Sequence, residues 1–109
     1  MPDTGKPDLR KMRESADQAT AMLRSLANRD RLLLLCQLSQ GELNVSELEK
    51  QLDIQQPSLS QQLGVLRREG LVATRREGKH IYYRVAAPQA LCLLQTLYHL
   101  YCAESSNVD

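Results

Sequence analysis

The sequence predicts a mainly α-helical domain that carries one small β-hairpin. Hydrophobic residues make up 42% of the 109 residues, and the only aromatic side chains are four Tyr. A Leu-rich core with few aromatic residues is typical of packed helices, because Leu combines a large apolar side chain with a high helix propensity. Helical spacing recurs along most of the chain and gives way to strand-like segments only between residues 71 and 85. The length favours one domain with a modest core, which dimerisation would enlarge.

A first helix is predicted after a short N-terminal tail. Residues 1–7 contain two Pro and no periodic apolar pattern, so we expect them to be disordered. Asp8 is a suitable N-cap for the helix that follows. Asn28 breaks the helical pattern. The apolar stripe of this helix consists of Met12, Ala16, Ala19, Leu23 and Leu26.

Two shorter helices are predicted next. Asp30 is expected to cap a second helix that runs through Leu38 and closes at Gly41, and its centre is apolar on most sides. Asn44 and Glu47, three residues apart, form the capping-box pattern that begins a third helix. The inner stripe of the third helix is Val45, Leu48 and Leu52.

A fourth helix follows after a tight connection at residues 53–55, and this predicts a helix-turn-helix. Pro57 is tolerated there because we expect it in the first turn. Gly70 suits the position just beyond the last turn, where positive φ is common. The inner stripe of the fourth helix is Leu59, Leu63 and Leu66.

Two strands and a last helix complete the predicted order. Residues 71–76 and 80–85 have strand-like composition, and the loop at residues 77–79 offers Gly78 for a positive φ. Pro88 opens the last helix. The order α-α-α-α-β-β-α is that of a winged helix-turn-helix. The apolar side of the last helix carries Leu91, Leu94, Leu97, Tyr98 and Tyr101.

This winged domain is expected to occupy residues 8–104, followed by a flexible end at residues 105–109. No apolar run approaches the ~20 residues that a membrane-spanning helix needs, and the N-terminus lacks the apolar stretch of a secretory signal. We therefore expect a cytoplasmic protein without membrane contact. No catalytic constellation is present in the sequence, so we expect neither an enzyme nor a bound cofactor.

Basic charge is concentrated where a winged domain would meet DNA. Residues 55–84 hold six Arg or Lys against two Glu, a net charge of +4, although the whole chain carries only +1. Such a clustered positive charge is the electrostatic footprint of a nucleic-acid-binding surface. In the predicted hairpin, we expect Arg75, Arg76 and Lys79 to contact the DNA backbone or the minor groove. An ordinary charged turn is the alternative for these three residues.

The N-terminal half of the fourth helix carries short or amide side chains outside its apolar stripe. Gln can pair bidentately with adenine, Ser can bond to a base or a phosphate, and helix N-termini favour phosphate. A solvated polar face is the alternative, but such a face would ordinarily include acids, and none precedes Glu69 in this helix. The fourth helix is therefore the predicted recognition helix, with Gln56, Ser58, Ser60, Gln61 and Gln62 as its DNA-binding residues.

The chain resembles the ArsR-type winged-helix repressors from about residue 12 to residue 102. The segments that carry the resemblance are residues 26–32, 43–48, 56–63 and 70–78. The resemblance implies a homodimer that docks through its first and last helices and binds an imperfect palindrome in double-stranded operator DNA. It also implies that an inducer releases the DNA.

The residues at the family's known metal-binding positions do not suggest metal binding in this chain. Metal sensors of the family carry Cys-x-Cys in the third helix, where this chain has Asn44 and Ser46. Other members use Asp, His and Glu on the last helix, and the matching stretch here, residues 89–99, is poor in such ligands. We therefore expect no bound metal. A metal sensor with an atypical site and a winged protein-interaction module remain alternatives.

Two of the three Cys instead resemble those of the BigR/SqrR/HlyU group, which senses persulfides and related oxidants through one Cys on the second helix and one near the end of the last. The resemblance implies redox sensing by Cys36 and Cys102, with reactive sulfur as the inducer. Cys92 is ten residues from Cys102, or ~15 Å along one helix, which exceeds the ~7 Å between Cα atoms that a disulfide allows. We expect a structural role for Cys92, whereas an inert core thiol is the alternative for Cys36.

Overall fold

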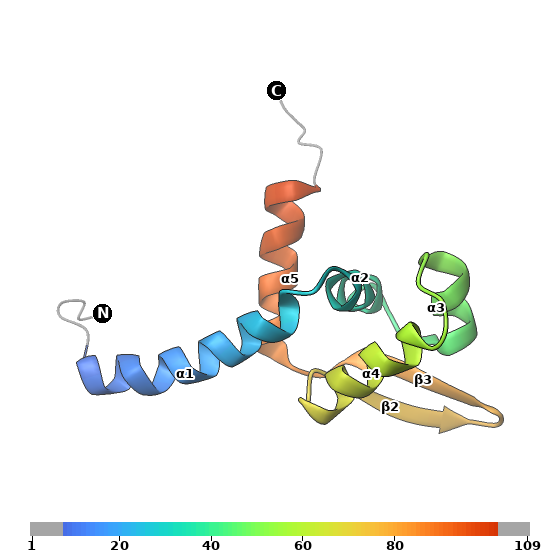
Figure 1. Ribbon diagram of the computed structural model, residues 1–109, viewed down its shortest axis with the longest axis horizontal. Coiled ribbons are helices and arrows are strands. Elements are labelled where there is room, and N and C mark those ends of the chain that lie inside the picture. Colours follow the sequence, from blue (N-terminus) through green and yellow to red (C-terminus); the bar gives the residue numbers. More distant parts are fainter. Residues whose placement is uncertain (1–7, 103–109) are drawn as a thin grey trace.

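The computed structural model describes residues 8–102 and confirms the winged helix-turn-helix order (Figure 1). The expected tails at residues 1–7 and 105–109 lie outside the described residues. The elements are α1 (Leu9–Leu26), α2 (Arg29–Leu38), β1 (Leu43–Asn44), α3 (Val45–Gln51), α4 (Ser58–Arg68), β2 (Val72–Glu77), β3 (His80–Val85) and α5 (Pro88–Tyr101).

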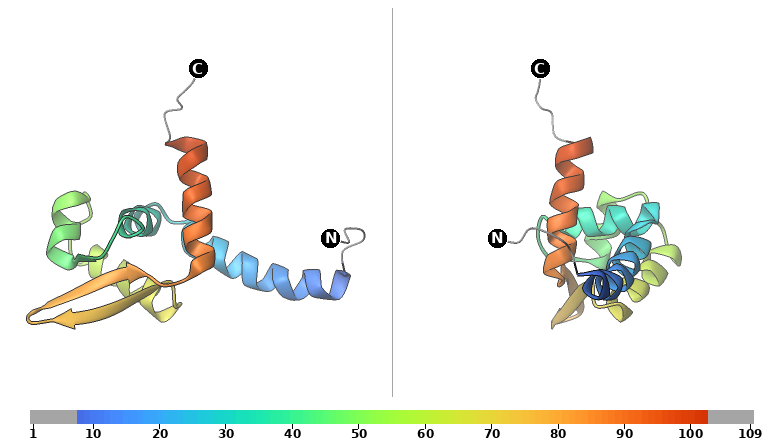
Figure 2. Two further views of the ribbon diagram at one scale, coloured as in Figure 1. Left: turned by 180° about the vertical axis from the view of Figure 1, so that it is seen from behind. Right: turned by 90° about the vertical axis from the view of Figure 1, so that its left-hand side faces the viewer.

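The elements form a head and two arms. The head consists of α2, α3, α4 and the small sheet, and the arms are α1 and α5, which project from the head in different directions (Figures 1 and 2). Beyond the ends that join them to the head, the two arms stand clear of the sheet and the helix-turn-helix. None of the helices in the described part of the chain is long and apolar enough to cross a membrane.

The head is held together by the apolar stripes that the sequence predicts. Leu34 and Leu35 of α2 are fully buried, and α2 lies against α4 at the centre of the head. Each stripe faces inward because helical residues three and four apart share one side. The other fully buried large side chains are Leu48, Leu59, Leu63, Leu66 and Leu94.

The sheet has three antiparallel strands in the order β1-β3-β2. Leu43 in β1 pairs with Tyr83 in β3, so the strand before the helix-turn-helix ties the hairpin to the head. This strand was not predicted, because two residues are too short to show a period. In the hairpin, Glu77 pairs with His80 and therefore belongs to β2 rather than to the loop. Gly78 adopts a φ of 63°, as expected for the turn.

Most predicted helix ends are confirmed, with two corrections. Asp8 caps α1, and Asn44 and Glu47 form the capping box of α3. Asn28, rather than Asp30, is the N-cap of α2: its side chain accepts a hydrogen bond from the Arg31 backbone N–H at 3.0 Å. Asn28 takes this role because α2 begins directly after a short bend. The second correction concerns Pro57, which is the N-cap of α4 and not a residue of its first turn.

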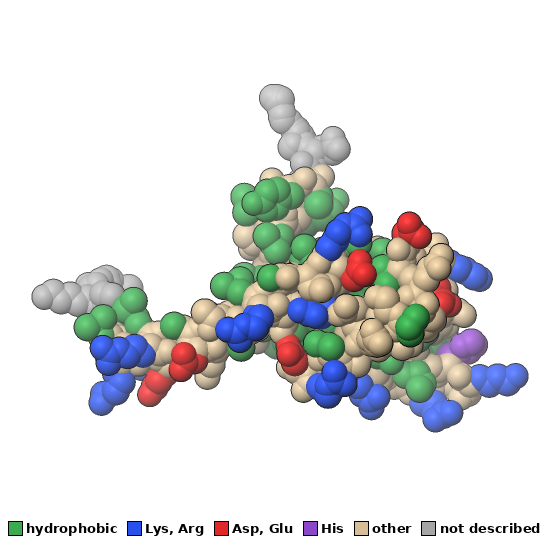
Figure 3. All heavy atoms as spheres, viewed as in Figure 1, with side chains coloured by type: hydrophobic (Ala, Val, Ile, Leu, Met, Phe, Trp, Pro, Cys, Tyr) green, Lys and Arg blue, Asp and Glu red, His purple; other side chains and the backbone are tan. Residues whose placement is uncertain are grey.

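The two arms leave apolar side chains exposed. Leu23 on α1 is 55% exposed, and Leu100 and Tyr101 on α5 are 67% and 81% exposed. Figure 3 shows apolar side chains on the surface of both arms. The buried residues of the arms lie in the half of each helix nearest the head and are Ser25, Leu26, Ala90 and Leu94. Within residues 8–102, the rest of the apolar side of each arm finds no cover.

Candidate nucleic-acid interface and cysteine pair

Helix α4 presents two of its predicted DNA-binding residues directly to solvent. The inner stripe of α4 is buried against the head, so the opposite side points outward. Ser60 and Gln61 lie on that outer side and are exposed, whereas Ser58 at the first position of the helix is half-buried. Gln61 is therefore the amide side chain of the helix best placed to reach a base edge.

Gln56 has a structural role that the sequence reading did not anticipate. Its side-chain Oε1 accepts a hydrogen bond from the backbone N–H of Ser60 at 3.0 Å. Pro57 provides no side-chain cap for α4, so Gln56 satisfies one of the free N–H groups of the first turn. Gln56 is exposed and lies at the same end of the helix as Gln61, but part of its hydrogen-bonding capacity is already used.

Gln62, which the sequence places at or near the outer face, is engaged within the chain. It is half-buried, and its Oε1 accepts a hydrogen bond from Arg31 Nη1 at 3.1 Å. The position of Gln62 next to the apolar stripe, three residues after Leu59, was the available signal. The sequence reading missed Arg31, because the two residues are 31 positions apart in the chain.

The neighbouring arginines of β2 lie on opposite faces of the sheet. Side chains alternate along a strand, so Arg75 shares one face with Glu77 and with its cross-strand partner Tyr82. Arg76 shares the other face with Val72, which is buried in the core against which α4 also packs. Arg76 is therefore on the side of the sheet that carries the recognition helix.

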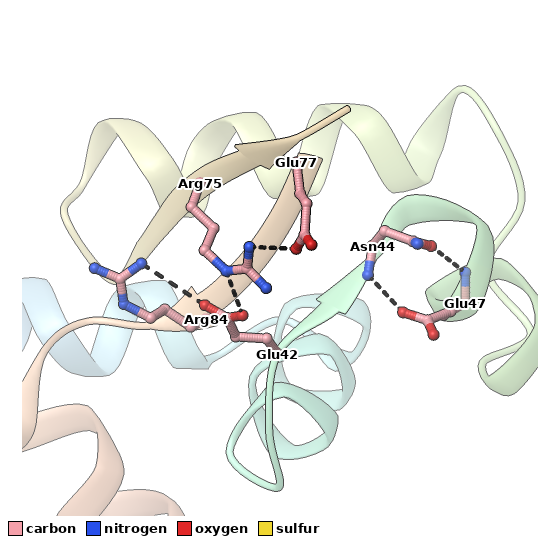
Figure 4. Close-up of polar contacts among 6 residues, drawn as sticks. All are labelled: Glu42, Asn44, Glu47, Arg75, Glu77 and Arg84. Atoms are coloured by element: carbon pink, nitrogen blue, oxygen red, sulfur yellow. Dashed lines mark hydrogen bonds and ion pairs between the residues drawn. The ribbon is translucent and has the colours of Figure 1, made fainter. Parts of the chain in front are cut away.

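Arg75 is engaged by acids of its own chain (Figure 4). Its Nη1 donates to Glu77 Oε1 and its Nε donates to Glu42 Oε1, both at 2.7 Å. These hydrogen bonds, that to Glu77 first, raise the pKa of the Arg75 guanidinium. The guanidinium also lies over the Tyr82 ring, 4.8 Å from its centroid. Glu42 and Glu77 both face Arg75, so its charge is already paired within the chain, and its contact with DNA stays a prediction.

The other predicted cations of the hairpin remain accessible. Arg76 is exposed and donates from Nε to the Gly78 carbonyl at 3.3 Å, which leaves its terminal nitrogens for other partners. Lys79 is exposed at the turn. Arg67 and Arg68 lie in the last turn of α4. Figure 3 shows Lys and Arg side chains along the edge of the molecule that α4 and the hairpin form.

The predicted cysteine pair spans α2 and the end of α5. Cys36 on α2 is half-buried, and Cys102 is the exposed C-cap of α5; both are free thiols. Burial raises the pKa of the Cys36 thiol, and the charge of Cys102 raises it further. Cys36 shares a pocket with Tyr98 and His99, so the last turns of α5 lie beside α2, although 66 positions separate Cys36 and Cys102 in the sequence.

Cys92 does not have the packed position that was expected of a structural cysteine. It is an exposed free thiol on α5. It also lines, together with Cys36, a pocket of about 400 Å³ between α2 and α5. The pocket is partly polar, with Ser39, Gln40, Thr96 and His99 on its walls. Within residues 8–102, no group of three or more His, Cys, Asp or Glu is arranged to hold a metal ion.

The chain is similar to known bacterial regulatory proteins. The family model described as "Bacterial regulatory protein, arsR family" matches residues 28–74. The chain is 49% identical to the biofilm growth-associated repressor of Agrobacterium fabrum, over 97% of this chain and 91% of that protein.

Solved structures of related regulators have the same fold. The transcriptional repressor BigR from Xylella fastidiosa matches with a TM-score of 0.82 and 44% identity, over 90% of this chain and all of that one. Reduced HlyU from Vibrio cholerae matches with a TM-score of 0.81 and 38% identity, over 84% and 97% of the two chains. A homodimeric winged helix-turn-helix DNA-binding domain from Mycobacterium bovis matches with a TM-score of 0.70 and 31% identity, over 90% and 89%.

Proposed function

This chain belongs to the ArsR family of bacterial regulatory proteins, and we propose that it is a repressor whose DNA binding is switched by Cys36 and Cys102. Its relatives are transcription regulators and not enzymes. The observations that carry the proposal are that Cys36 lines a pocket between α2 and α5 and that Cys102 is the C-cap of the same α5. Neither cysteine belongs to the outer face of α4, so we expect both to be available to a signal while DNA is bound.

In the DNA-bound state, we expect α4 to enter the major groove and the hairpin to contact the flanking backbone. Gln61 and Ser60 are the exposed polar side chains of α4, and Arg76 and Lys79 are the accessible cations of the hairpin. In this proposal, three other polar residues support the DNA-binding face without contacting DNA themselves: Gln56, Ser58 and Gln62. The protein acts in the cytoplasm, where thiols are kept reduced until a signal arrives.

We expect two chains to assemble through their arms. A groove of about 570 Å³ between α1 and α5 is lined by Met22, Leu23 and Leu93. Apolar grooves of this kind on a small chain are typical of interfaces. A two-fold homodimer would cover them and place two copies of α4 on the halves of an imperfect palindrome. The homodimeric state of the Mycobacterium bovis domain supports this arrangement.

Reaction with a persulfide, RSSH, oxidises the two thiols to a crosslink. The Cys36 thiolate attacks the terminal sulfur of RSSH and releases RSH, which leaves a persulfide on Cys36. The Cys102 thiolate then attacks the Cys36 sulfur, forms the disulfide and releases hydrogen sulfide. A second equivalent of RSSH, consumed before closure, would instead give a trisulfide. Either product ties α2, in the middle of the head, to the end of α5.

The crosslink is proposed to change the distance between the two reading helices of the dimer. Helix α2 packs against α4, so a displacement of α2 relative to the α5 arm is carried to the reading face. A change of ~3 kcal/mol in the preference between two arrangements would weaken DNA binding more than a hundredfold.

A DNA-binding titration of three variants tests the proposal. Cys36→Ser and Cys102→Ser should each bind the promoter region of the protein's own gene like wild type, and each should fail to release it after treatment with glutathione persulfide. Cys92→Ser is the matched control and should release DNA normally. A reductant should restore binding in wild type, provided that oxidation stops before sulfinic acid. If Cys36→Ser still released DNA while Cys92→Ser did not, the sensing pair would be misassigned.

A further inference from the structure

One arginine joins the C-terminal end of α1 and the start of α2 to the recognition helix, α4. Arg31, in the first turn of α2, is half-buried and uses three nitrogens of its guanidinium. Nε donates to the Ser25 carbonyl at 2.8 Å, and Nη2 donates to the Arg24 carbonyl at 3.3 Å. Nη1 donates to Gln62 Oε1 on α4 at 3.1 Å. The planar guanidinium spreads its donors over three nitrogens in fixed directions, whereas an ammonium group carries all its donors on one nitrogen.

A second contact joins the same two elements further along α4. The hydroxyl of Ser25, which is only 5% exposed, donates to Glu69 Oε1 just beyond the last turn of α4. Gln62 and Glu69 are seven residues apart, so they lie two turns apart on one side of the helix axis, about 10 Å from each other. Arg31 of α2, which is itself bonded to the end of α1, and Ser25 of α1 therefore hold the recognition helix at two points, and this fixes its direction as well as its position.

From these contacts we propose that Arg31 is a positioning residue for operator recognition and that Gln62 is its acceptor rather than a base reader. The inference rests on the proposed role of α4 as the reading helix. In a dimer joined by its arms, the angle between α1 and α4 sets the separation of the two reading helices. Specific binding needs both helices in adjacent major grooves, whereas non-specific binding depends on charge alone.

Changes at Gln62 separate positioning from base reading. Gln62→Glu keeps an acceptor for Arg31 and makes the bond charge-assisted, so it should bind operator within about threefold of wild type. Gln62→Met has similar length and no comparable acceptor, so it should lose about tenfold in operator affinity, the scale of one hydrogen bond to a charged group. Gln61→Glu is the matched control on the exposed face. It places an unpaired carboxylate against the DNA and should lose more than about tenfold.

Changes at Arg31 test the other end of the contact. Arg31→Lys keeps the positive charge but not the fork, so operator affinity should fall about tenfold while affinity for a scrambled duplex of the same length stays unchanged. The double variant Arg31→Lys with Gln62→Met should bind operator no more weakly than the worse single variant, because both remove one shared contact. A purely structural role would lower the thermal midpoint without changing the ratio of operator to scrambled affinity.

Fluorescence anisotropy with both duplexes, together with thermal unfolding, distinguishes the outcomes. The positioning role is supported if Gln62→Glu binds operator and Arg31→Lys loses only specific affinity. It is overturned if Gln62→Glu is as damaging as Gln61→Glu, or if Arg31→Lys weakens both duplexes equally or changes only the thermal midpoint. If Gln61→Glu has no effect on operator binding, the proposed reading role of α4 fails, and the positioning role fails with it.

Discussion

The head and the arms bury their apolar residues in different ways. In the head, the inner stripes of α2, α3 and α4 meet one another, and Leu63 of α4 is 1% exposed. In the arms, Leu23 of α1 and Leu100 of α5 remain more than half exposed. The head thus buries its apolar surface within one chain, whereas the exposed apolar side chains of the arms need a second surface to cover them. Under the proposed function, the head therefore carries folding and DNA reading, and the arms carry assembly and one cysteine of the switch.

The largest expected effect is on the folding stability of the head. Leu63→Ala should lower the free energy of unfolding by about 2–5 kcal/mol, because it removes buried methyl groups and leaves a cavity. Denaturant titration at several protein concentrations measures this change. Leu9→Ala truncates the same side chain type at the free end of α1, where it is 66% exposed, and should change the free energy by less than about 1 kcal/mol. Equal losses would contradict the division into head and arms.

The next largest effect is expected on dimer stability, from a change in the arms. Leu23→Asp should destabilise the dimer by about 2–3 kcal/mol, because it places an unpaired carboxylate in the predicted interface. Sedimentation at micromolar concentration should then show a monomer whose circular dichroism spectrum is unchanged. Operator affinity should fall with the loss of the second half-site. A variant that stayed dimeric would move the interface away from the groove between α1 and α5.

A smaller effect is expected at the reading face of the head. Gln61→Ala should weaken operator binding by about 1–3 kcal/mol, the range for a good bidentate base contact. Affinity for a scrambled duplex should not change, because a base contact contributes only to specific binding. Wild-type operator affinity in this variant would show that the outer side of α4 does not face the bases.

The two hairpin arginines should differ in their salt dependence. Arg76→Ala should reduce the slope of log affinity against log salt concentration by about 0.9, the contribution of one phosphate contact. Arg75→Ala should leave that slope nearly unchanged, because Glu42 and Glu77 already neutralise the Arg75 guanidinium. Titrations at four or five salt concentrations measure both slopes. Equal reductions would mean that Arg75 exchanges its acids for phosphates when DNA binds.

The smallest effect concerns the pH dependence of the thiols. The raised pKa of Cys36 means that its thiolate forms at higher pH than an ordinary Cys thiolate. The rate at which Cys36 reacts with iodoacetamide should therefore still be rising at a pH where exposed thiols have reached their plateau. Cys102→Ser removes one of the two causes and should shift the midpoint of the rate profile to lower pH. An unshifted midpoint would show that Cys102 does not approach Cys36 in solution.

Local patterns were enough to predict much of the fold. The stripe of Leu59, Leu63 and Leu66 follows the helical period, and the capping box of Asn44 and Glu47 requires only a spacing of three residues. The hairpin was recognisable for the same reason. The errors at helix ends concern neighbouring residues of similar chemistry, such as Asn28 and Asp30, which cap helices about equally well.

The candidate site was less predictable because its polar contacts join distant segments. Glu77, two residues after Arg75 on the same face of the strand, was a local signal for one ion pair, but the second partner, Glu42, lies 33 positions earlier. The same holds for Gln62, whose partner Arg31 belongs to another helix. Strand β1 was missed because two residues show no period; they form a strand only by pairing with β3.

Periodicity and capping act over a few residues, so they predict the order of the helices and hairpin strands and the side of each head helix that faces the core. Which polar side chains remain free on the surface depends on contacts that form only when distant segments pack together. A side chain such as Gln61 or Arg76 stays available to a ligand because no distant partner reaches it in the described structure. Gln62 and Arg75 are engaged because chain folding brings Arg31 and Glu42 to them.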